Sequence, residues 1–357
     1  MDNKELASAN NLSGEIVWKS PANIAIVKYW GKYGVQLPRN PNISFTLQKA
    51  VTKMMLHYSQ KKNLTDNNIS LKFEFSEADK SEKFRQKIMA FMSSVLNEFP
   101  FLTQLDMRIE SENSFPHSAG IASSASSMSA LALCLCSLES RLTGKLKENS
   151  PAFFKRASYI ARLASGSACR SVYTGMALWG KMKEVKGSSD MYAIDFNAHI
   201  HPVFKTYHDA ILIVSTAEKN VSSRMGHGLM NNNVYAAPRY KQARERMIAL
   251  LEILKSGDTH AFGQIAEDEA MTLHALMMTS SPSFTLLKPN TLNMIEVLRE
   301  WRQQTNIPTY FSLDAGPNLH LLYPDEFAEQ TKTFIETSLK PFCEGGMIIY
   351  DKVAAGS

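Results

Sequence analysis

The feature that most constrains the fold is a run of small residues directly before a long apolar stretch. Residues 115–135 read FPHSAGIASSASSMSALALCL, and the apolar positions predict a helix from about residue 123 to residue 141. The first N–H groups of a helix have no partner within it, and the helix dipole attracts anions to this end. The segment therefore predicts either a phosphate-binding helix start or a tightly packed helix–strand junction. The absence of GxxxxGK[ST] excludes a Walker A loop.

The composition is that of a globular chain. Of its 357 residues, 44% are hydrophobic and 20% charged, which is enough for two domains with buried cores. The formal net charge of +5 comes from scattered lysines and arginines, so no nucleic-acid partner is expected. Cys134, Cys136, Cys169 and Cys343 show no CxxC spacing, which favours structural thiols in a reducing compartment.

Several classes of protein are excluded by what the sequence lacks. The first residues have neither the basic start nor the apolar core of a secretory signal, and the apolar stretch around residues 131–136 is too short to cross a bilayer. We therefore expect a cytoplasmic protein without a membrane partner. The sequence has no GxSxG elbow, the motif of many hydrolases. It also has no HExxH motif or His/carboxylate cluster that would suggest a protein-bound metal.

Predicted strands and helices are mixed without regular βαβ alternation. Residues 15–32 predict two strands joined at a Ser20-Pro21 turn, and a helix over 81–99 has Ser81 as its N-cap. Further strands are expected at 42–58, 71–77, 106–115, 209–216 and 345–353, with a hairpin at 309–323. Further helices are expected at 151–164, 237–255, 258–276, 286–304 and 326–339. The mixture favours an α+β fold, with domains over 1–205 and 206–357.

Four segments together resemble one known family. PxxxGxxSSAS at 116–126 resembles the ATP-binding motif of the GHMP kinases. NIAIVKYWGK at 23–32, ASGSACRS at 164–171 and SLDAGPNLHLLY at 312–323 narrow the resemblance to diphosphomevalonate decarboxylases. The resemblance spans most of the chain. It departs from the family pattern in the phosphate loop, where PHSAGIASSA replaces PTAAGLASSA and leaves the role of His117 open.

The resemblance implies both a fold and a reaction. The fold is that of the GHMP kinases, with an N-terminal ribosomal-S5-like domain, a C-terminal α+β sandwich domain and the active site in the cleft between them. In the reaction, ATP phosphorylates the 3-hydroxyl of (R)-5-diphosphomevalonate, and loss of phosphate and CO₂ gives isopentenyl diphosphate. Mg²⁺ is expected to arrive on the ATP phosphates, with Ser124 as a candidate ligand. A homodimer is implied by the resemblance alone. The implied ATP-binding residues are Pro116, Ser118, Gly120, Ala122, Ser123, Ser124 and Ser126.

Two residues are the main candidates for chemistry. Asp314 stands before the AGPN turn, where its carboxylate can orient the substrate hydroxyl and accept its proton. The alternative is an aspartate that caps its own turn. Lys28 lies in the apolar run IAIVKYW, where an unpaired charge is costly, so it needs an anionic partner such as Asp314 or a phosphate. The alternative is a lysine that snorkels from a strand edge.

The remaining candidates bind substrate. The guanidinium of Arg170 is a planar fork suited to a carboxylate, and the resemblance implies that it holds the substrate carboxylate as a third catalytic residue. Asn23 is expected to orient Arg170 or the substrate hydroxyl. The diphosphate is assigned to Tyr29, Lys32, Ser165, Gly166 and Ser167. Ser222, Ser223 and Arg224, in VSSRMGH at 221–227, have open roles.

Two other functions fit the same fold. One is a decarboxylase of monophosphomevalonate or a mevalonate 3-kinase that stops after phosphorylation. The other is a GHMP-fold protein that binds a ligand or partner without catalysis. The presence of candidates for the diphosphate site, the carboxylate site and the catalytic aspartate favours the complete reaction over both.

Overall fold

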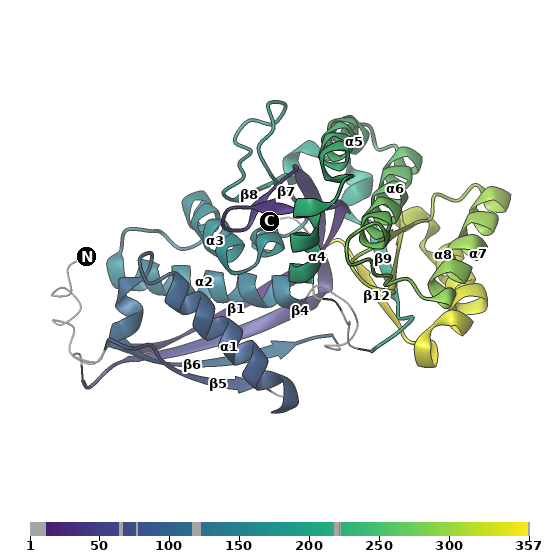
Figure 1. The fold of residues 1–357 in the computed structure, drawn as a ribbon. Coiled ribbons are helices and arrows are strands. Elements are labelled where there is room, and N and C mark those ends of the chain that lie inside the picture. The colour runs from purple at the N-terminus through teal and green to yellow at the C-terminus, as the bar shows by residue number, and fades with distance from the viewer. Residues whose placement is uncertain are drawn as a thin grey trace.

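The computed structural model describes residues 12–63, 67–75, 78–115, 123–217, 221 and 223–355. Two main sheets organise these residues (Figure 1). The first sheet and its helices form the purple-to-teal part of the ribbon, and the second sheet with α5 to α8 forms the green-to-yellow part. The mixture of sheets and helices confirms the expected α+β fold.

The first sheet has six strands in the order β5-β6-β4-β7-β8, with β1 also paired to β4. Its strands are β1 (Ser13–Val27), β4 (Asn42–Gln60), β5 (Ser70–Phe75), β6 (Leu105–Asn113), β7 (Met176–Trp179) and β8 (Ala193–Asp195). The long β4 is central because its first residues pair with β7, its last with β6, and nearly its whole length with β1. A two-stranded ribbon of β2 (Lys32–Tyr33) and β3 (Leu37–Pro38) lies between β1 and β4 in the chain.

The predicted turn at Ser20-Pro21 is wrong, because β1 runs through it. The register against β4 shifts between Pro21 and Asn23, so a bulge absorbs the proline within one strand. The predicted N-cap at Ser81 is also wrong, because α1 (Ala78–Ser94) has already begun there. The short strands β7 and β8 were not predicted.

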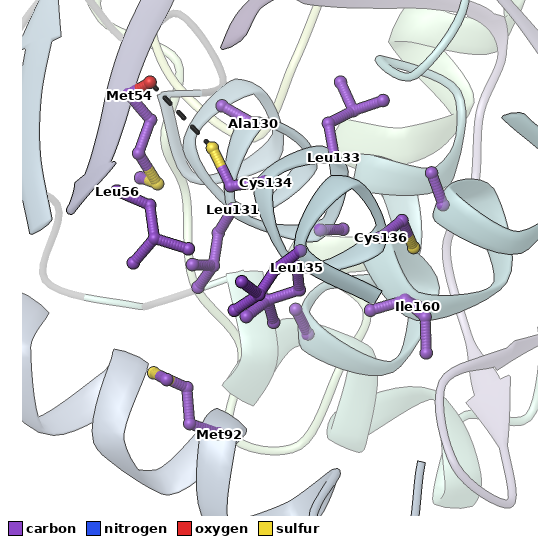
Figure 2. Packing of buried hydrophobic residues seen from close by; sticks show 14 of the residues in the cluster. Met54, Leu56, Met92, Ala130, Leu131, Leu133, Cys134, Leu135, Cys136 and Ile160 are labelled. Atoms are coloured by element: carbon purple, nitrogen blue, oxygen red, sulfur yellow. Dashed lines mark hydrogen bonds between the residues drawn. The ribbon is translucent and has the colours of Figure 1, made fainter. Parts of the chain in front are cut away.

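Helices α2 (Ser123–Thr143) and α3 (Pro151–Ala164) pack with α1 and the first sheet around one core. Ser150 caps α3 by accepting a hydrogen bond from the Phe153 N–H. The apolar run in α2 is buried on almost every side, with Leu131 and Leu135 fully covered (Figure 2). All four cysteines are free and buried, as expected for structural thiols.

The second sheet is antiparallel, with the order β10-β11-β9-β12. Its strands are β9 (His208–Leu212), β10 (Tyr310–Leu313), β11 (Leu319–Tyr323) and β12 (Ile348–Lys352). The helices after β9 are α4 (Ser223–Leu229), α5 (Ala236–Ser256), α6 (Thr259–Met278), α7 (Pro289–Thr305) and α8 (Ala328–Phe334). Gly257, with φ 81°, ends α5, and the Asp258 side chain caps α6 by accepting from the Ala261 N–H.

Short turns complete the described elements. Turns of 3₁₀ type lie at Pro100–Gln104, Gly166–Cys169, Asn197–His199, Pro202–Lys205, Met230–Asn232, Asp325–Phe327, Lys340–Phe342 and Glu344–Gly346, and a π turn lies at Ile335–Leu339. Within the described ranges, no helix combines the length and the apolar character needed to cross a bilayer.

The two sheets meet where β4 passes the end of the chain. Leu47 forms a β-bridge with Val353, and the Ala354 N–H donates to the Thr46 carbonyl at 2.8 Å. One apolar cluster includes Ile24 of β1, Met247 of α5 and Leu322 of β11, so the core is continuous between the sheets. The end of β1 is thereby held against the end of β10. The domain boundary near residue 205 stays a prediction.

Candidate active site

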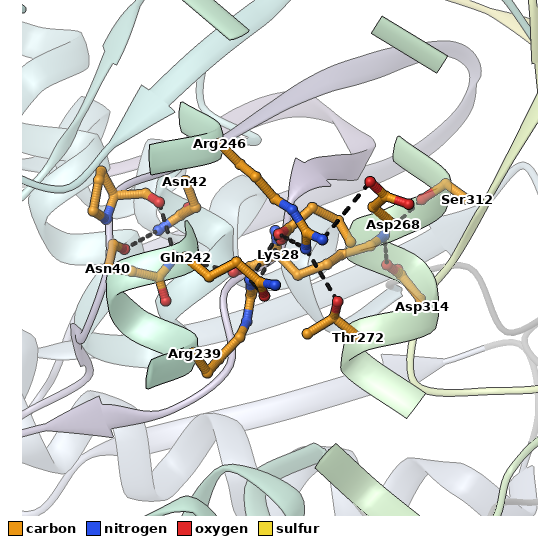
Figure 3. A network of polar contacts seen from close by, with 12 residues as sticks. Lys28, Asn40, Asn42, Arg239, Gln242, Arg246, Asp268, Thr272, Ser312 and Asp314 are labelled. Carbon is orange, nitrogen blue, oxygen red and sulfur yellow. Dashed lines mark hydrogen bonds and ion pairs between the residues drawn. The ribbon is translucent and has the colours of Figure 1, made fainter. Parts of the chain in front are cut away.

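Lys28 and Asp314 form an ion pair where the two sheets meet. Lys28 follows the last residue of β1, and Asp314 follows β10. The Lys28 Nζ lies 3.2 Å from the Asp314 Oδ1 and donates to the Ser312 hydroxyl at 2.8 Å (Figure 3). The Lys28 side chain is 3% exposed and that of Asp314 28%, so the carboxylate is the accessible member of the pair. Burial lowers the pKa of Lys28, and the Asp314 charge opposes that shift.

Arg170 occupies a buried cage of neutral acceptors. Its Nε donates to the Ser44 hydroxyl at 2.9 Å, one terminal nitrogen donates to the Asn23 Oδ1 at 3.1 Å, and the other donates to the Asn42 Oδ1. Among the described residues, no carboxylate lies within ion-pair distance of this guanidinium. Burial lowers the pKa of Arg170, and the Asp314 charge lies close enough to oppose the shift. A buried cation without an ion-pair partner favours an anionic ligand.

Gly166, one of the residues assigned to the diphosphate, lies beside the Tyr29 side chain. Ser165 ends α3, and Gly166 and Ser167 form the turn that follows. A Cβ atom at Gly166 would lie 2.8 Å from the Tyr29 hydroxyl, so only glycine permits this approach. The Tyr29 hydroxyl is buried and has no hydrogen-bond partner among the described residues, and the Asn23 amide donates to the Ser167 carbonyl at 3.4 Å. An orphaned buried hydroxyl is rare unless a ligand or a water completes it.

His227, in α4, is a site residue that the sequence reasoning missed. The Gly31 N–H donates to its Nδ1 at 3.0 Å, and its ring centroid lies 4.3 Å from that of Tyr29. Lys32, which also donates to the Gln36 side chain at 3.2 Å, is close enough to lower the pKa of His227. The signal for His227 in the sequence is its position at the end of the VSSRMGH segment.

Helix α6 contributes two further residues that the sequence did not reveal. Glu269 is fully buried, and one of its carboxylate oxygens accepts the Lys28 backbone N–H at 2.8 Å. The same carboxylate pairs with Arg239 and Arg246 of α5. The His274 Nε2 donates to the Asp314 carbonyl at 3.1 Å. One helix therefore holds the backbone of both members of the Lys28–Asp314 pair.

The proposed phosphate loop lies largely outside the described residues. Pro116, Ser118, Gly120 and Ala122 fall there, as does His117. Ser123 is the first residue of α2, and the Ser124 hydroxyl accepts a hydrogen bond from Lys87 of α1. The Ser126 hydroxyl is buried and bonded to the Thr52 hydroxyl at 2.7 Å, so we leave Ser126 out of the nucleotide site.

The segment at 221–227 is described only in part. Ser222 is not among the described residues, and for Ser223 and Arg224 only the helical backbone is described. Across the described residues, no group of three or more histidine, cysteine, aspartate or glutamate side chains is arranged to hold a metal ion.

Comparison with known proteins gives the same assignment along the chain. The model of the diphosphomevalonate decarboxylase-like N-terminal domain matches residues 20–193, and that of the mevalonate 5-diphosphate decarboxylase C-terminal domain matches residues 210–352. The diphosphomevalonate decarboxylase of Debaryomyces hansenii is 28% identical, over 86% of this chain and 79% of the relative. The diphosphomevalonate decarboxylase of Saccharomyces cerevisiae is 27% identical, over 88% of this chain and 79% of the relative.

Solved structures share the whole fold. The mevalonate diphosphate decarboxylase of Staphylococcus aureus superposes with a TM-score of 0.81 at 28% identity, covering 97% of both chains. Another neighbour, MDDEF in complex with MVAPP, AMPPCP and magnesium, has a TM-score of 0.79 at 27% identity and covers 97% of this chain and 98% of its own. These neighbours confirm the GHMP kinase fold. The chain belongs to the diphosphomevalonate decarboxylase family.

Proposed function

We propose that this chain catalyses the ATP-dependent decarboxylation of (R)-5-diphosphomevalonate to isopentenyl diphosphate. The observation that carries the proposal is the pairing of two features at one place. The Arg170 guanidinium is buried among neutral acceptors, and the partly exposed Asp314 carboxylate lies within its electrostatic reach beside Lys28. The first feature suits the substrate carboxylate, and the second suits its hydroxyl.

Asp314 has the position needed to begin the reaction. Its carboxylate orients the 3-hydroxyl and accepts its proton while the oxygen takes the γ-phosphoryl group of ATP, which leaves ADP. Lys28 holds the carboxylate in place through the 3.2 Å ion pair, and its charge favours the phosphoryl oxygens. The C3–O bond then breaks, and phosphate leaves with the electron pair. The electrons of the C1–C2 bond form the C2–C3 double bond, and CO₂ is released.

The rest of the pocket fixes the two ends of the substrate. Arg170 holds the carboxylate until it leaves, and Asn23 fixes the guanidinium through the 3.1 Å contact. The diphosphate is bound by Tyr29, Lys32 and the Ser165–Ser167 turn. Gly166 has no side chain, so the backbone of this turn can lie close to the Tyr29 hydroxyl. Binding energy at the diphosphate end then positions the distant reacting carbon.

ATP binds at the start of α2, with Mg²⁺ carried on its phosphates. Ser123 and Ser124 head this helix, and the N–H groups of its first turn point toward the phosphates. The MDDEF neighbour with AMPPCP and magnesium supports this pair of ligands. The proposal also includes domains over 1–205 and 206–357, a homodimer and a cytoplasmic location.

One assay tests the reaction against its variants. Purified protein is incubated with ATP, Mg²⁺ and, separately, mevalonate, its 5-phosphate and its 5-diphosphate, and ADP and CO₂ are measured together. We expect equal amounts of ADP and CO₂, with the 5-diphosphate preferred. ADP without CO₂ would identify a 3-kinase, preference for the 5-phosphate would identify a monophosphate decarboxylase, and no turnover would leave a binding protein.

A further inference from the structure

The protonation state of His227 is fixed by its surroundings. The Gly31 N–H donates to Nδ1 at 3.0 Å, and a ring nitrogen that accepts a hydrogen bond carries no proton. Burial, and secondarily the nearby Lys32 charge, lowers the pKa of His227 to about 3. The ring is therefore neutral near pH 7, and its single proton lies on Nε2. His227 thus presents an uncharged N–H donor from this atom.

The His227 ring packs against the ring of Tyr29. The two ring centroids are 4.3 Å apart, and Trp30 packs against the imidazole with a centroid distance of 4.8 Å. The Tyr29 hydroxyl has no partner within the described residues, and no described residue takes the His227 Nε2–H. The two aromatic contacts and the Nδ1 hydrogen bond hold the imidazole in one orientation. Because 9% of the residue stays exposed, the ring is almost but not fully enclosed.

Two donors in this part of the site, the Tyr29 hydroxyl and the His227 Nε2–H, have no acceptor among the described residues. The Lys32 ammonium is near enough for its charge to act on the histidine. A phosphate group has several acceptor oxygens and is stabilised by converging donors of this kind. A neutral imidazole donor adds a hydrogen bond without adding another cation beside Lys32.

We propose that His227 binds the phosphate-bearing end of the substrate by donating its Nε2–H to a phosphate oxygen. The proposal rests on the proposed function, because it assigns a further ligand-binding residue to the same site. His227 then has two separate tasks. Its Nδ1 anchors the backbone at Gly31, and its Nε2 contacts substrate.

Two substitutions separate these tasks. In His227→Asn the side-chain oxygen can replace Nδ1 as the acceptor for Gly31, but the donor at the Nε2 position is lost. In His227→Gln the longer amide can place an N–H near the Nε2 position, but the acceptor at Nδ1 is lost. The same His-to-Asn change at His199, which packs against Phe196, is the matched control. Thermal unfolding of each variant identifies any that fails to fold.

Binding of 5-diphosphomevalonate is measured by calorimetry without ATP, and KM values for 5-diphosphomevalonate and ATP are measured by turnover. We expect His227→Asn to weaken diphosphomevalonate binding about tenfold or more, because a donor to a charged oxygen is lost. The KM for ATP should stay near that of the wild type, and His227→Gln should bind more tightly than His227→Asn.

A folded His227→Asn variant that binds like the wild type would overturn the proposal, as would a His227→Gln variant that is the weaker of the two. Either result would leave His227 as a structural cap for Gly31. Failure of the proposed function has a different signature. In that case the wild type itself would not release CO₂ from 5-diphosphomevalonate, whatever the binding of the variants.

Discussion

Lys28 and Arg170 are each held in this site by several hydrogen bonds from their charged ends. Lys28 donates to both Ser312 and Asp314, and Arg170 donates to three neutral side chains. Such contacts fix the rotamers, so the charged ends need little rearrangement when a ligand binds. The cost is burial of cations, which is tolerable because each has several hydrogen-bond partners.

Replacement of Asp314 by asparagine tests the catalytic base. We expect Asp314→Asn to keep ATP and substrate binding but to lower kcat by at least about 100-fold, because shape is kept while the proton acceptor is lost. Steady-state kinetics and substrate binding would be measured together. Asp325→Asn, at an exposed aspartate paired with His208, serves as the control. A near-normal kcat in Asp314→Asn would remove this residue from the mechanism.

Replacement of Arg170 by glutamine tests the carboxylate site. One neutral amide cannot supply the bidentate fork, so Arg170→Gln should lower kcat/KM for 5-diphosphomevalonate by roughly 100-fold. The KM for ATP should change little. If the variant instead raised only the KM for ATP, Arg170 would belong to the nucleotide and not to the carboxylate.

The pKa of His227 makes a prediction about stability. Its value of about 3 in the folded state lies below the ordinary 6.5, so the folded chain resists a proton that the unfolded chain accepts. The stability from the neutral ring is therefore complete above pH 6.5 and falls as pH drops toward 3. Between pH 7 and pH 5 the wild type should lose about 2 kcal/mol more than His227→Asn. Urea unfolding of both proteins at pH 7 and pH 5 measures this difference in stability loss. If the ring were freely protonated in the folded protein, the wild type and His227→Asn would lose the same stability.

At the scale of elements, α6 sets the distance between the two halves of the catalytic pair. Glu269 of α6 accepts the Lys28 N–H, and His274, farther along the same helix, donates to the Asp314 carbonyl. Burial alone would raise the pKa of Glu269, but Arg239 and Arg246 bring it below its ordinary value. The carboxylate is thus ionised and able to hold α5, α6 and β1 together.

Loss of the Glu269 carboxylate should therefore affect both stability and rate. Glu269→Ala leaves two arginines and the Lys28 amide without their shared acceptor, and removal of one partner of a buried pair costs about 3–5 kcal/mol. The free energy of unfolding, measured with a chemical denaturant, and kcat should both fall. Glu245→Ala, which removes an exposed pair with Lys241, should change stability by less than about 1 kcal/mol. Equal effects of the two variants would show that α6 does not depend on this carboxylate.

At the scale of the molecule, Asp351 ties the second sheet to the first. From β12 its carboxylate accepts the backbone N–H groups of Gln48, Lys49 and Ala50 in β4, with contacts between 2.7 and 3.1 Å. These bonds sit beside the Leu47–Val353 bridge. The junction therefore combines apolar packing with a buried carboxylate that accepts hydrogen bonds from the backbone of the other sheet.

Removal of this carboxylate should loosen the junction. Asp351→Ala leaves several backbone N–H groups without an acceptor, and we expect a loss of about 3 kcal/mol. Hydrogen exchange at residues 48–50 should rise more than in the core of α2. Asp325→Ala, at an exposed position, provides the comparison. Unchanged exchange at residues 48–50 would show that the bridge alone maintains the contact.

The sequence by itself determined most of the local elements and the candidates for chemistry. The limits of α3 and the hairpin of β10 and β11 followed from periodicity and turn residues, because these signals act over a few neighbours. The need of Lys28 for an anionic partner followed from the cost of a charge in an apolar strand, and the Asp314 contact satisfies it.

The tertiary structure alone decided which residues meet. Lys28 and Asp314 are 286 positions apart, and Gly31 and His227 are 196 apart, so no local pattern specifies either contact. The same holds for Pro21, where pairing with β4 keeps the chain extended although Ser-Pro locally favours a turn. Burial gives His227 its neutral ring, and the packing of α5 against α6 gives Glu269 its arginine partners. Neither follows from sequence spacing, because desolvation and charge contacts depend on everything packed around a group.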